Sequence, residues 1–261
     1  MYRVNVYTRF MATSAAVPRR IAAKKTVADP RLLRNQALTD VRRQSVLDAA
    51  RSAFFELGME KASMREIAQR AGYTVGAIYS YFASKEEVYG ALLAESLERL
   101  NARVQQALDG CTGEAARVQR SAKAFFDFYR ENPRDLDLGF YLFQGMNPRG
   151  LTPDLNEKLN ARLRDALQPT QDALQALGLS AKGALEEVTA LFAHTVGLLV
   201  LSHTGRIRMF KQGSQDLFDA YLRQLLGRAT AVSRSLSGFH AYPADVAPET
   251  MVTSKCQLPS P

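Results

Sequence analysis

The chain has 261 residues, a formal net charge of +8, two cysteines and no tryptophan, and its length fits two domains or one large one. Hydrophobic residues make up 46% and charged residues 23%, as in ordinary soluble proteins, which excludes a wholly disordered chain. Cys111 and Cys256 match no metal-ligand or disulfide spacing, so we expect no metal site and a reducing, cytoplasmic compartment.

Residues 1–37 show no sustained hydrophobic period and are predicted to form a flexible basic arm. The first 38 residues carry eight basic side chains and one acidic side chain, so most of the excess positive charge lies here. Such charge favours an acidic partner, above all nucleic acid. Two alternatives stay open: an Arg-rich targeting presequence, and a reading in which the true start is Met11 or the segment is functionally silent.

The next segment has the period of a helix with one buried face. Its apolar residues recur at three- and four-residue steps, at Val46, Leu47, Ala50, Phe54 and Leu57. Gly58 is predicted to end this helix, because glycine adopts the left-handed conformation found just past helix ends.

Three helix starts then follow closely. Capping-box patterns at Ser63–Glu66 and Ser84–Glu87 predict two of them, and Thr74 is the N-cap candidate for the third. Gly72 suits a tight turn between the first two helices, which are both short. Two short helices joined in this way are typical of a helix-turn-helix, whose second helix enters the major groove of DNA.

The remaining chain is predicted to be helical, with Pro169 kinking or dividing the fourth of the later helices. Their expected ranges are 84–108, 114–131, 134–145, 154–177, 182–204 and 214–235. The most apolar stretch, 188–202, is too short to span a membrane and contains His194, so we expect a buried helix and no membrane partner. Residues 237–261 are rich in proline and are predicted to be a disordered tail.

The helix-turn-helix residues closely resemble the TetR family of bacterial transcriptional regulators. The matching segments are Ser63–Ala68, Ala71–Phe82 and Ser84–Val88, together with the preceding helix. The resemblance implies an all-α homodimer with a three-helix N-terminal DNA-binding head, here residues 38–90, and a larger ligand-binding and dimerisation body, here residues 91–236. It further implies a sequence-specific, ligand-responsive repressor that binds a near-palindromic operator in double-stranded DNA and takes an unknown small-molecule effector.

The candidate DNA-binding residues lie in and around the matched recognition helix. Thr74 either contacts bases or only caps the helix, and Gly76 is costly in a helix unless something approaches closely. Tyr79 is a phosphate contact by its match to the family, with packing inside the head as the alternative. The full candidate set is Ser63, Arg65, Thr74, Val75, Gly76, Ala77, Tyr79, Tyr81 and Lys85.

The body is rich in aromatic residues, most of which we expect in an ordinary core. The family resemblance favours a pocket that some of them line, because ligand sites are apolar with a few polar groups. The candidate pocket residues are Phe125, Tyr129, Tyr141 and His194.

An enzyme is the main rival class, but the chain has no phosphate-binding glycine loop, nucleophile elbow or clustered metal-ligand set. We therefore predict no catalytic residues and no cofactor. A helical scaffold that has lost DNA binding is the second rival, and the intact motif argues against it.

Overall fold

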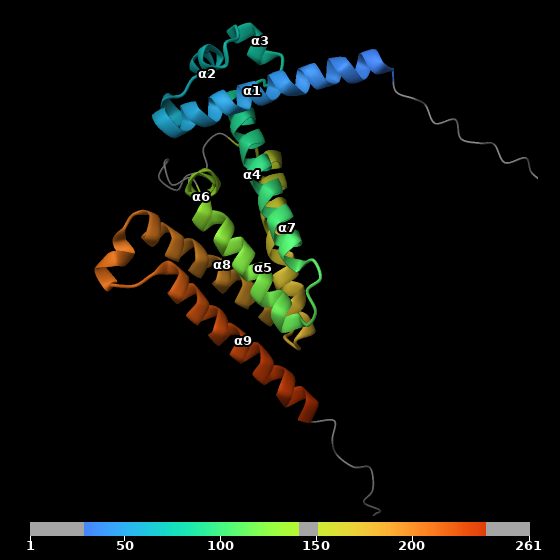
Figure 1. The fold of residues 1–261 in the computed structure, drawn as a ribbon, viewed down its shortest axis with the longest axis vertical. Helices are drawn as coiled ribbons and strands as arrows, with labels where there is room; N and C mark the ends of the chain where they lie inside the picture. The colour runs from blue at the N-terminus through green and yellow to red at the C-terminus, as the bar shows by residue number, and fades with distance from the viewer. Residues whose placement is uncertain (1–28, 141–150, 239–261) are drawn as a thin grey trace, which may run out of the picture. The chain divides into compact units, whose positions relative to one another are not determined.

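The computed structural model describes residues 29–140 and 151–238, and its helices follow one another as shown in Figure 1. Every regular element in these two ranges is a helix, which confirms the all-α prediction. The chain divides into two compact units, Met1–Arg42 and Arg43–Pro261.

The described part of the first unit is the beginning of helix α1, which runs from Pro30 to Lys61. Asp29 caps this helix by accepting a hydrogen bond from the N–H of Arg31 at 2.9 Å. Pro30 takes the first helical position, where a missing N–H costs nothing. Residues 30–37 are thus helical rather than part of a flexible arm, and residues 1–28 lie outside the described residues.

Within the second unit, α1 is interrupted where the sequence predicts a stop. Gly58 has φ 76° and ψ 159°, which is not helical, and a short turn carries the chain to Lys61. The three predicted starts then follow in order, giving α2 (Met64–Ala71), α3 (Val75–Tyr79) and α4 (Lys85–Leu108). The three-helix head and its tight turn are therefore present as predicted.

The later helices match their predicted ranges to within a few residues. They are α5 (Glu114–Glu131), α6 (Pro133–Phe140), α7 (Pro153–Ala176), α8 (Ala181–His203), the short 3₁₀ turn η2 (Arg206–Phe210) and α9 (Ser214–Gly238). The predicted end of α6, near residue 145, lies outside the described residues.

Helix α7 is not divided at Pro169, since it runs unbroken from Pro153 to Ala176; a kink at Pro169 stays a prediction. Contacts on either side hold it in place: Ala166 and Thr170 are both buried. The Thr170 hydroxyl lies 2.7 Å from the Ser121 hydroxyl of α5, so this buried pair fixes the two helices against each other. Packing of this kind offsets the hydrogen bond that proline removes from the helix.

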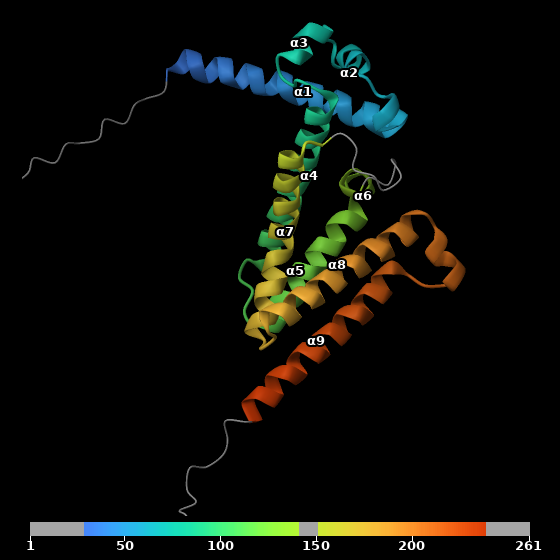
Figure 2. The same ribbon diagram turned by 180° about the vertical axis from the view of Figure 1, so that it is seen from behind.

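In both views α4, α5 and α7 lie side by side, with α8 and α9 as an adjoining pair (Figures 1 and 2). The Phe126 ring of α5 stacks on the Phe218 ring of α9, with centroids 4.2 Å apart. Both side chains are fully buried, so the body has a continuous aromatic core that joins α9 to the central helices.

Among the described helices, α8 alone is long and apolar enough to cross a membrane by length and composition. It has 23 residues, so it is longer than the apolar stretch that the sequence predicts. Its face with Val188, Leu191 and Leu199 is buried in the core of the body. That packing is what the sequence predicts for a buried helix of a globular protein.

Candidate nucleic-acid interface

The first short helix of the motif, α2, is capped at both ends by local residues. Ser63 accepts a hydrogen bond from the N–H of Glu66 at 3.1 Å, as its capping-box pattern predicts. At the other end Gly72 is left-handed, with φ 72°, and its N–H donates to the carbonyls of Ala68 and Gln69. The turn to α3 therefore depends on a glycine for its backbone geometry.

Helix α3 begins at Thr74, whose hydroxyl accepts from the N–H of Ala77 at 3.2 Å. Capping is thus a role that Thr74 performs within the protein, and its exposed side chain leaves DNA contact open as well. Ile78 is fully buried and anchors the opposite face of α3 in the head. The helix therefore has a fixed inner side and an accessible outer side.

The outer side of α3 holds most of the candidate DNA-binding residues. Gly76 is exposed, Val75 and Ala77 are half-buried, and the Tyr79 side chain is 52% exposed. That exposure argues against packing inside the head as the main role of Tyr79. Tyr81 is half-buried and packs against the core, and Arg65 on α2 is exposed.

Apart from the neighbouring residues and the backbone of α3 itself, no atom of the described residues lies within 4 Å of the place that a Cβ would occupy at Gly76. Its backbone does not have the positive φ that favours glycine. Neither packing nor backbone geometry within the described residues therefore requires a glycine here, although glycine weakens a helix. The open space is available to a close external surface.

The candidate DNA contact Lys85 and the nearby Arg70 of α2 are both engaged inside the head. The Lys85 ammonium donates to the carbonyl oxygen of Met59 at 2.6 Å, close to the end of α1. Arg70 pairs with Glu56 and Glu66, each at 2.8 Å. The Ser52 hydroxyl, which donates to Glu56 at 2.9 Å, and then Arg70 lower the pKa of Glu56. Lys85 remains a predicted phosphate contact, since its ammonium group has three donors and the Met59 carbonyl takes one of them.

Arg43 shows a contact that sequence reasoning missed. Its guanidinium carbon lies 4.8 Å from the centroid of the buried Phe82 ring, just before α4. A cation over an aromatic face is favourable, so Arg43 helps to hold α1 against the end of the motif. No local spacing in the sequence links Arg43 and Phe82, so sequence pattern alone could not predict this contact.

Three of the candidate pocket residues of the body pack against other aromatic rings. Phe125 and Tyr129 are buried, with ring centroids 5.3 Å apart in an edge-to-face contact. His194 stacks on Tyr221 of α9 at 4.2 Å. Tyr141 lies outside the described residues.

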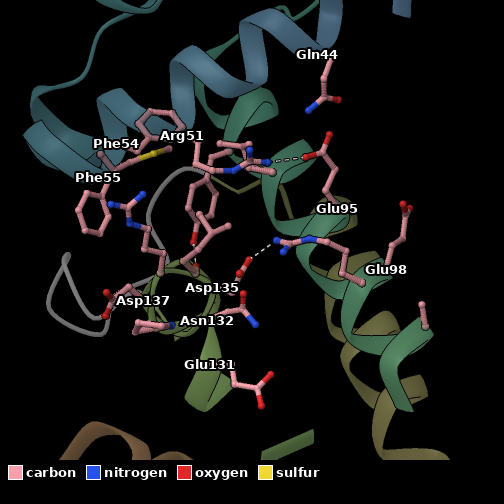
Figure 3. Close-up of a pocket in the computed structure, with 18 residues that line it drawn as sticks. Gln44, Arg51, Phe54, Phe55, Glu95, Glu98, Glu131, Asn132, Asp135 and Asp137 are labelled. Atoms are coloured by element: carbon pink, nitrogen blue, oxygen red, sulfur yellow. Dashed lines mark hydrogen bonds and ion pairs between the residues drawn. The ribbon is translucent and has the colours of Figure 1, made fainter. Parts of the chain in front are cut away.

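A cavity of about 930 Å³ lies elsewhere, between the second half of α1, α4 and α6. Figure 3 shows Phe54 and Phe55 on α1, Glu95 and Glu98 on α4, and Asp135 and Asp137 on α6. Phe125, Tyr129 and His194 are not among its lining residues. Sequence reasoning missed this cavity because its residues come from segments far apart in the chain.

Comparison with known proteins agrees with the geometry of the head. Residues 46–92 match the family model of the bacterial regulatory proteins of the tetR family. The chain is 37% identical over 106 residues to the transcriptional activator FasR of Mycolicibacterium smegmatis, covering 41% of this chain and 48% of FasR. It is 36% identical over 86 residues to the transcriptional repressor KstR2 of Mycobacterium tuberculosis, covering 33% and 43%.

A solved structure extends the likeness over the body. The transcriptional regulator FadR of Bacillus subtilis, in complex with stearoyl-CoA, superposes with a TM-score of 0.55 at 19% identity, covering 70% of this chain and 97% of FadR. The match to the curated relatives spans less than half the length of each. The capped α2–turn–α3 arrangement and the family match identify residues 46–92 as a domain of the tetR family of bacterial regulatory proteins, and the solved structure shares the helical fold.

Proposed function

We propose that this chain is a cytoplasmic, ligand-responsive transcriptional repressor. It acts as a homodimer whose two α3 helices bind a near-palindromic operator, and a small-molecule effector releases it from DNA. The head is assigned to residues 38–90 and the ligand-binding and dimerisation body to residues 91–236. Its relatives include both an activator and a repressor. We choose repression because it is the usual effect of a regulator of this family on transcription.

The observation that carries the proposal is the open outer face of α3. Thr74, Gly76 and Tyr79 are exposed there, while Ile78 holds the inner face in the core. The N-terminal residues of a recognition helix contact base edges, and hydroxyl groups bind phosphates without reading sequence. We assign Thr74–Ala77 to base edges, and Ser63, Arg65, Tyr79, Tyr81 and Lys85 to phosphates or to neighbouring bases.

The outward faces of α8 and α9 support the dimer. The exposed residues of α8 include Thr189, Ala190, Ala193 and Gly197, which are small enough for a partner helix to approach closely. Gly227 of α9 is also exposed, and space around its backbone is open. A two-fold axis through these helices would place two α3 helices about one turn of DNA apart.

Binding to DNA is tested with labelled fragments that flank the gene encoding this chain, read by fluorescence anisotropy over a range of salt concentrations. We expect a saturable complex that survives excess unrelated DNA and weakens as salt rises, because phosphate contacts release counterions. The absence of a sequence-preferring complex at every salt concentration would favour the scaffold alternative.

Tyr79→Phe removes one hydroxyl and keeps the ring. The loss of one phosphate hydrogen bond in each half-site should weaken operator binding by the dimer about 30-fold, by the roughly 1 kcal/mol of a typical hydrogen bond in each protomer. Tyr221→Phe in the body is the matched control and should bind DNA like the parent protein.

A further inference from the structure

The first turns of α1 are an exposed helix that the proposed function does not use. They belong to the first compact unit and precede residues 46–92, which carry the family match. Every residue from 33 to 44 is exposed, and the first buried residue of α1 is Val46. Most helices in proteins gain their stability by packing one face against a core. The surface of this stretch is therefore open to a partner outside the described chain.

Three arginines share one face of this exposed helix. An α-helix turns by about 100° per residue, so Arg31, Arg34 and Arg42 fall within about 80° of its circumference. All three are exposed, and we call them the basic face. From Arg31 to Arg42 the basic face spans about 16 Å along the helix axis. A strand of duplex DNA carries several phosphates over such a length.

The acidic residues of the same helix leave the basic face uncompensated. Asp40 lies about 160° away from it around the helix. Asp29 is the N-cap, and its carboxylate accepts from the backbone N–H of Arg31 at 2.9 Å. Within residues 29–140 and 151–238, no carboxylate forms an ion pair with Arg31, Arg34 or Arg42. Three positive charges therefore stand together in solvent without an internal counterion.

The apolar residues of this helix do not form a continuous face. Leu33, Leu38 and Val41 are 58%, 50% and 64% exposed. Arg34 falls between Val41 and Leu38, about 20° from the first and about 40° from the second around the helix. A helix that lies in a membrane surface keeps its cations on the opposite, polar side. Two copies packed through this side would bring like charges together. The pattern therefore favours a polyanion over an apolar partner.

We propose that the basic face binds phosphate groups of duplex DNA. A guanidinium group is a planar fork that can donate two parallel hydrogen bonds to one phosphate. Such contacts carry no sequence information, so they add affinity and leave the choice of bases to α3. In this respect the site rests on the proposed function, because α3 selects the operator and the basic face strengthens the binding.

Covalent attachment to the head keeps the basic face within reach of bound DNA. Arg42 is four residues before the buried Val46 in the same helix. Arg31 is 15 residues before Val46, which is about 23 Å along the helix axis. Tethering over such a distance gives the arginines a high effective concentration near DNA, so that contacts weak in isolation still add to the overall affinity.

The salt dependence of binding tests the proposal, because each phosphate contact adds about 0.9 to the slope of log affinity against log salt concentration. Fluorescence anisotropy of the full-length protein is measured on the operator and on an unrelated duplex between about 50 and 200 mM salt. Arg31→Gln/Arg34→Gln/Arg42→Gln, the basic-face variant, keeps residues that favour helix and removes up to six contacts from a dimer.

We expect the basic-face variant to lower the magnitude of the slope by about 2 to 5 on both duplexes. Operator affinity at low salt should fall at least about tenfold, and affinity for the unrelated duplex should fall by a similar factor, because phosphate contacts do not read sequence. An unchanged slope on both duplexes would overturn the proposal.

Two further variants separate the position of the charges from their number. Arg34→Gln/Gln36→Arg keeps the net charge and moves one cation about 160° around the helix, so the slope should fall by about 2 in a dimer. Arg206→Gln/Arg208→Gln/Lys211→Gln removes three exposed cations at η2 in the body and should leave the slope unchanged. An equal fall in this body variant would make net charge the cause and contradict the basic face.

The unrelated duplex keeps this proposal separate from the proposed function. If the parent protein shows no preference for the operator but the basic-face variant lowers both slopes, only the sequence-specific repressor is contradicted. If the parent protein prefers its operator and the basic-face variant keeps the parent slope, only the basic face is contradicted. Binding to phosphatidylglycerol vesicles that the basic-face variant loses, with both DNA slopes unchanged, would assign the arginines to a lipid surface and overturn the proposal.

Discussion

At the scale of single residues, Gly76 lets protein stability and DNA recognition be separated. Gly76→Ala meets no atom within 4 Å, so the variant should raise the free energy of unfolding by about 0.5–1 kcal/mol through lower backbone entropy in the unfolded chain. The same methyl group would occupy space that we assign to DNA, so operator affinity should fall about tenfold, the equivalent of a lost close contact.

Urea unfolding and fluorescence anisotropy measure the two effects of Gly76→Ala. Gly58→Ala provides the contrast, since its φ of 76° makes any side chain costly and the variant should be less stable. Unchanged operator affinity in a more stable Gly76→Ala protein would remove this residue from the proposed DNA contact.

Lys85 marks the limit of prediction from sequence at this scale. Its place after the Ser84 cap follows from local pattern, and the structure has α4 beginning there. Its hydrogen bond to the Met59 carbonyl spans 26 residues and depends on how α1 and α4 pack. Local spacing finds the element that carries a residue, but tertiary packing decides its partner.

At the scale of elements, we expect His194 to make the stability of the α8–α9 pair depend on pH. Burial lowers its pKa below 6.5, and its Nε2 atom is buried without a hydrogen-bond partner in the described structure. A lowered histidine pKa means that the unfolded chain binds protons more readily. The contribution of neutral His194 to the free energy of unfolding is therefore fully present above pH 6.5. It is lost as the pH falls toward the lower pKa of the folded state.

We expect the melting temperature to fall between about pH 7.5 and 5.5, and His194→Phe to reduce that fall, because phenylalanine keeps the stacking and does not titrate. His203→Gln, at an exposed position of the same helix, is the control and should leave the fall unchanged. The same pH dependence in His194→Phe as in the parent protein would place the responsible group elsewhere.

Helix starts were the elements most accessible from sequence, because a cap is a local contact. Ser63, Thr74 and Ser84 each accept the predicted N–H bond. The start of α1 at Pro30 could also have been predicted, because Asp29 followed by Pro30 is typical of a helix N-terminus. It was missed because the residues that follow show no hydrophobic period. The continuity of α7 through Pro169 and the cavity beside α6 had no local signal, since both depend on contacts between distant helices.

At the scale of the whole molecule, the proposed dimer is open to disruption by one charge. Ala193 is exposed on α8, and Ala193→Arg would place a long cation in the proposed two-fold interface. We expect a folded monomer by sedimentation velocity and operator binding at least about tenfold weaker, because the two half-sites are no longer bound by one particle. Asn160→Arg, exposed on α7, is the matched control. A dimeric Ala193→Arg protein would exclude this face as the interface.

Helix α4 belongs to both functional parts of the protein, since the predicted boundary at residue 90 falls inside it. It has 24 residues without interruption, so it is a rigid rod about 36 Å long. Val88 at one end is buried in the head, and Val104 at the other is buried in the body. A tilt of only about 5° at the body end would carry the head end sideways by about 3 Å, which is as long as a hydrogen bond. Under the proposed function, the rod would act as a lever that converts a small movement around an effector into a displacement large enough to break contacts with a base.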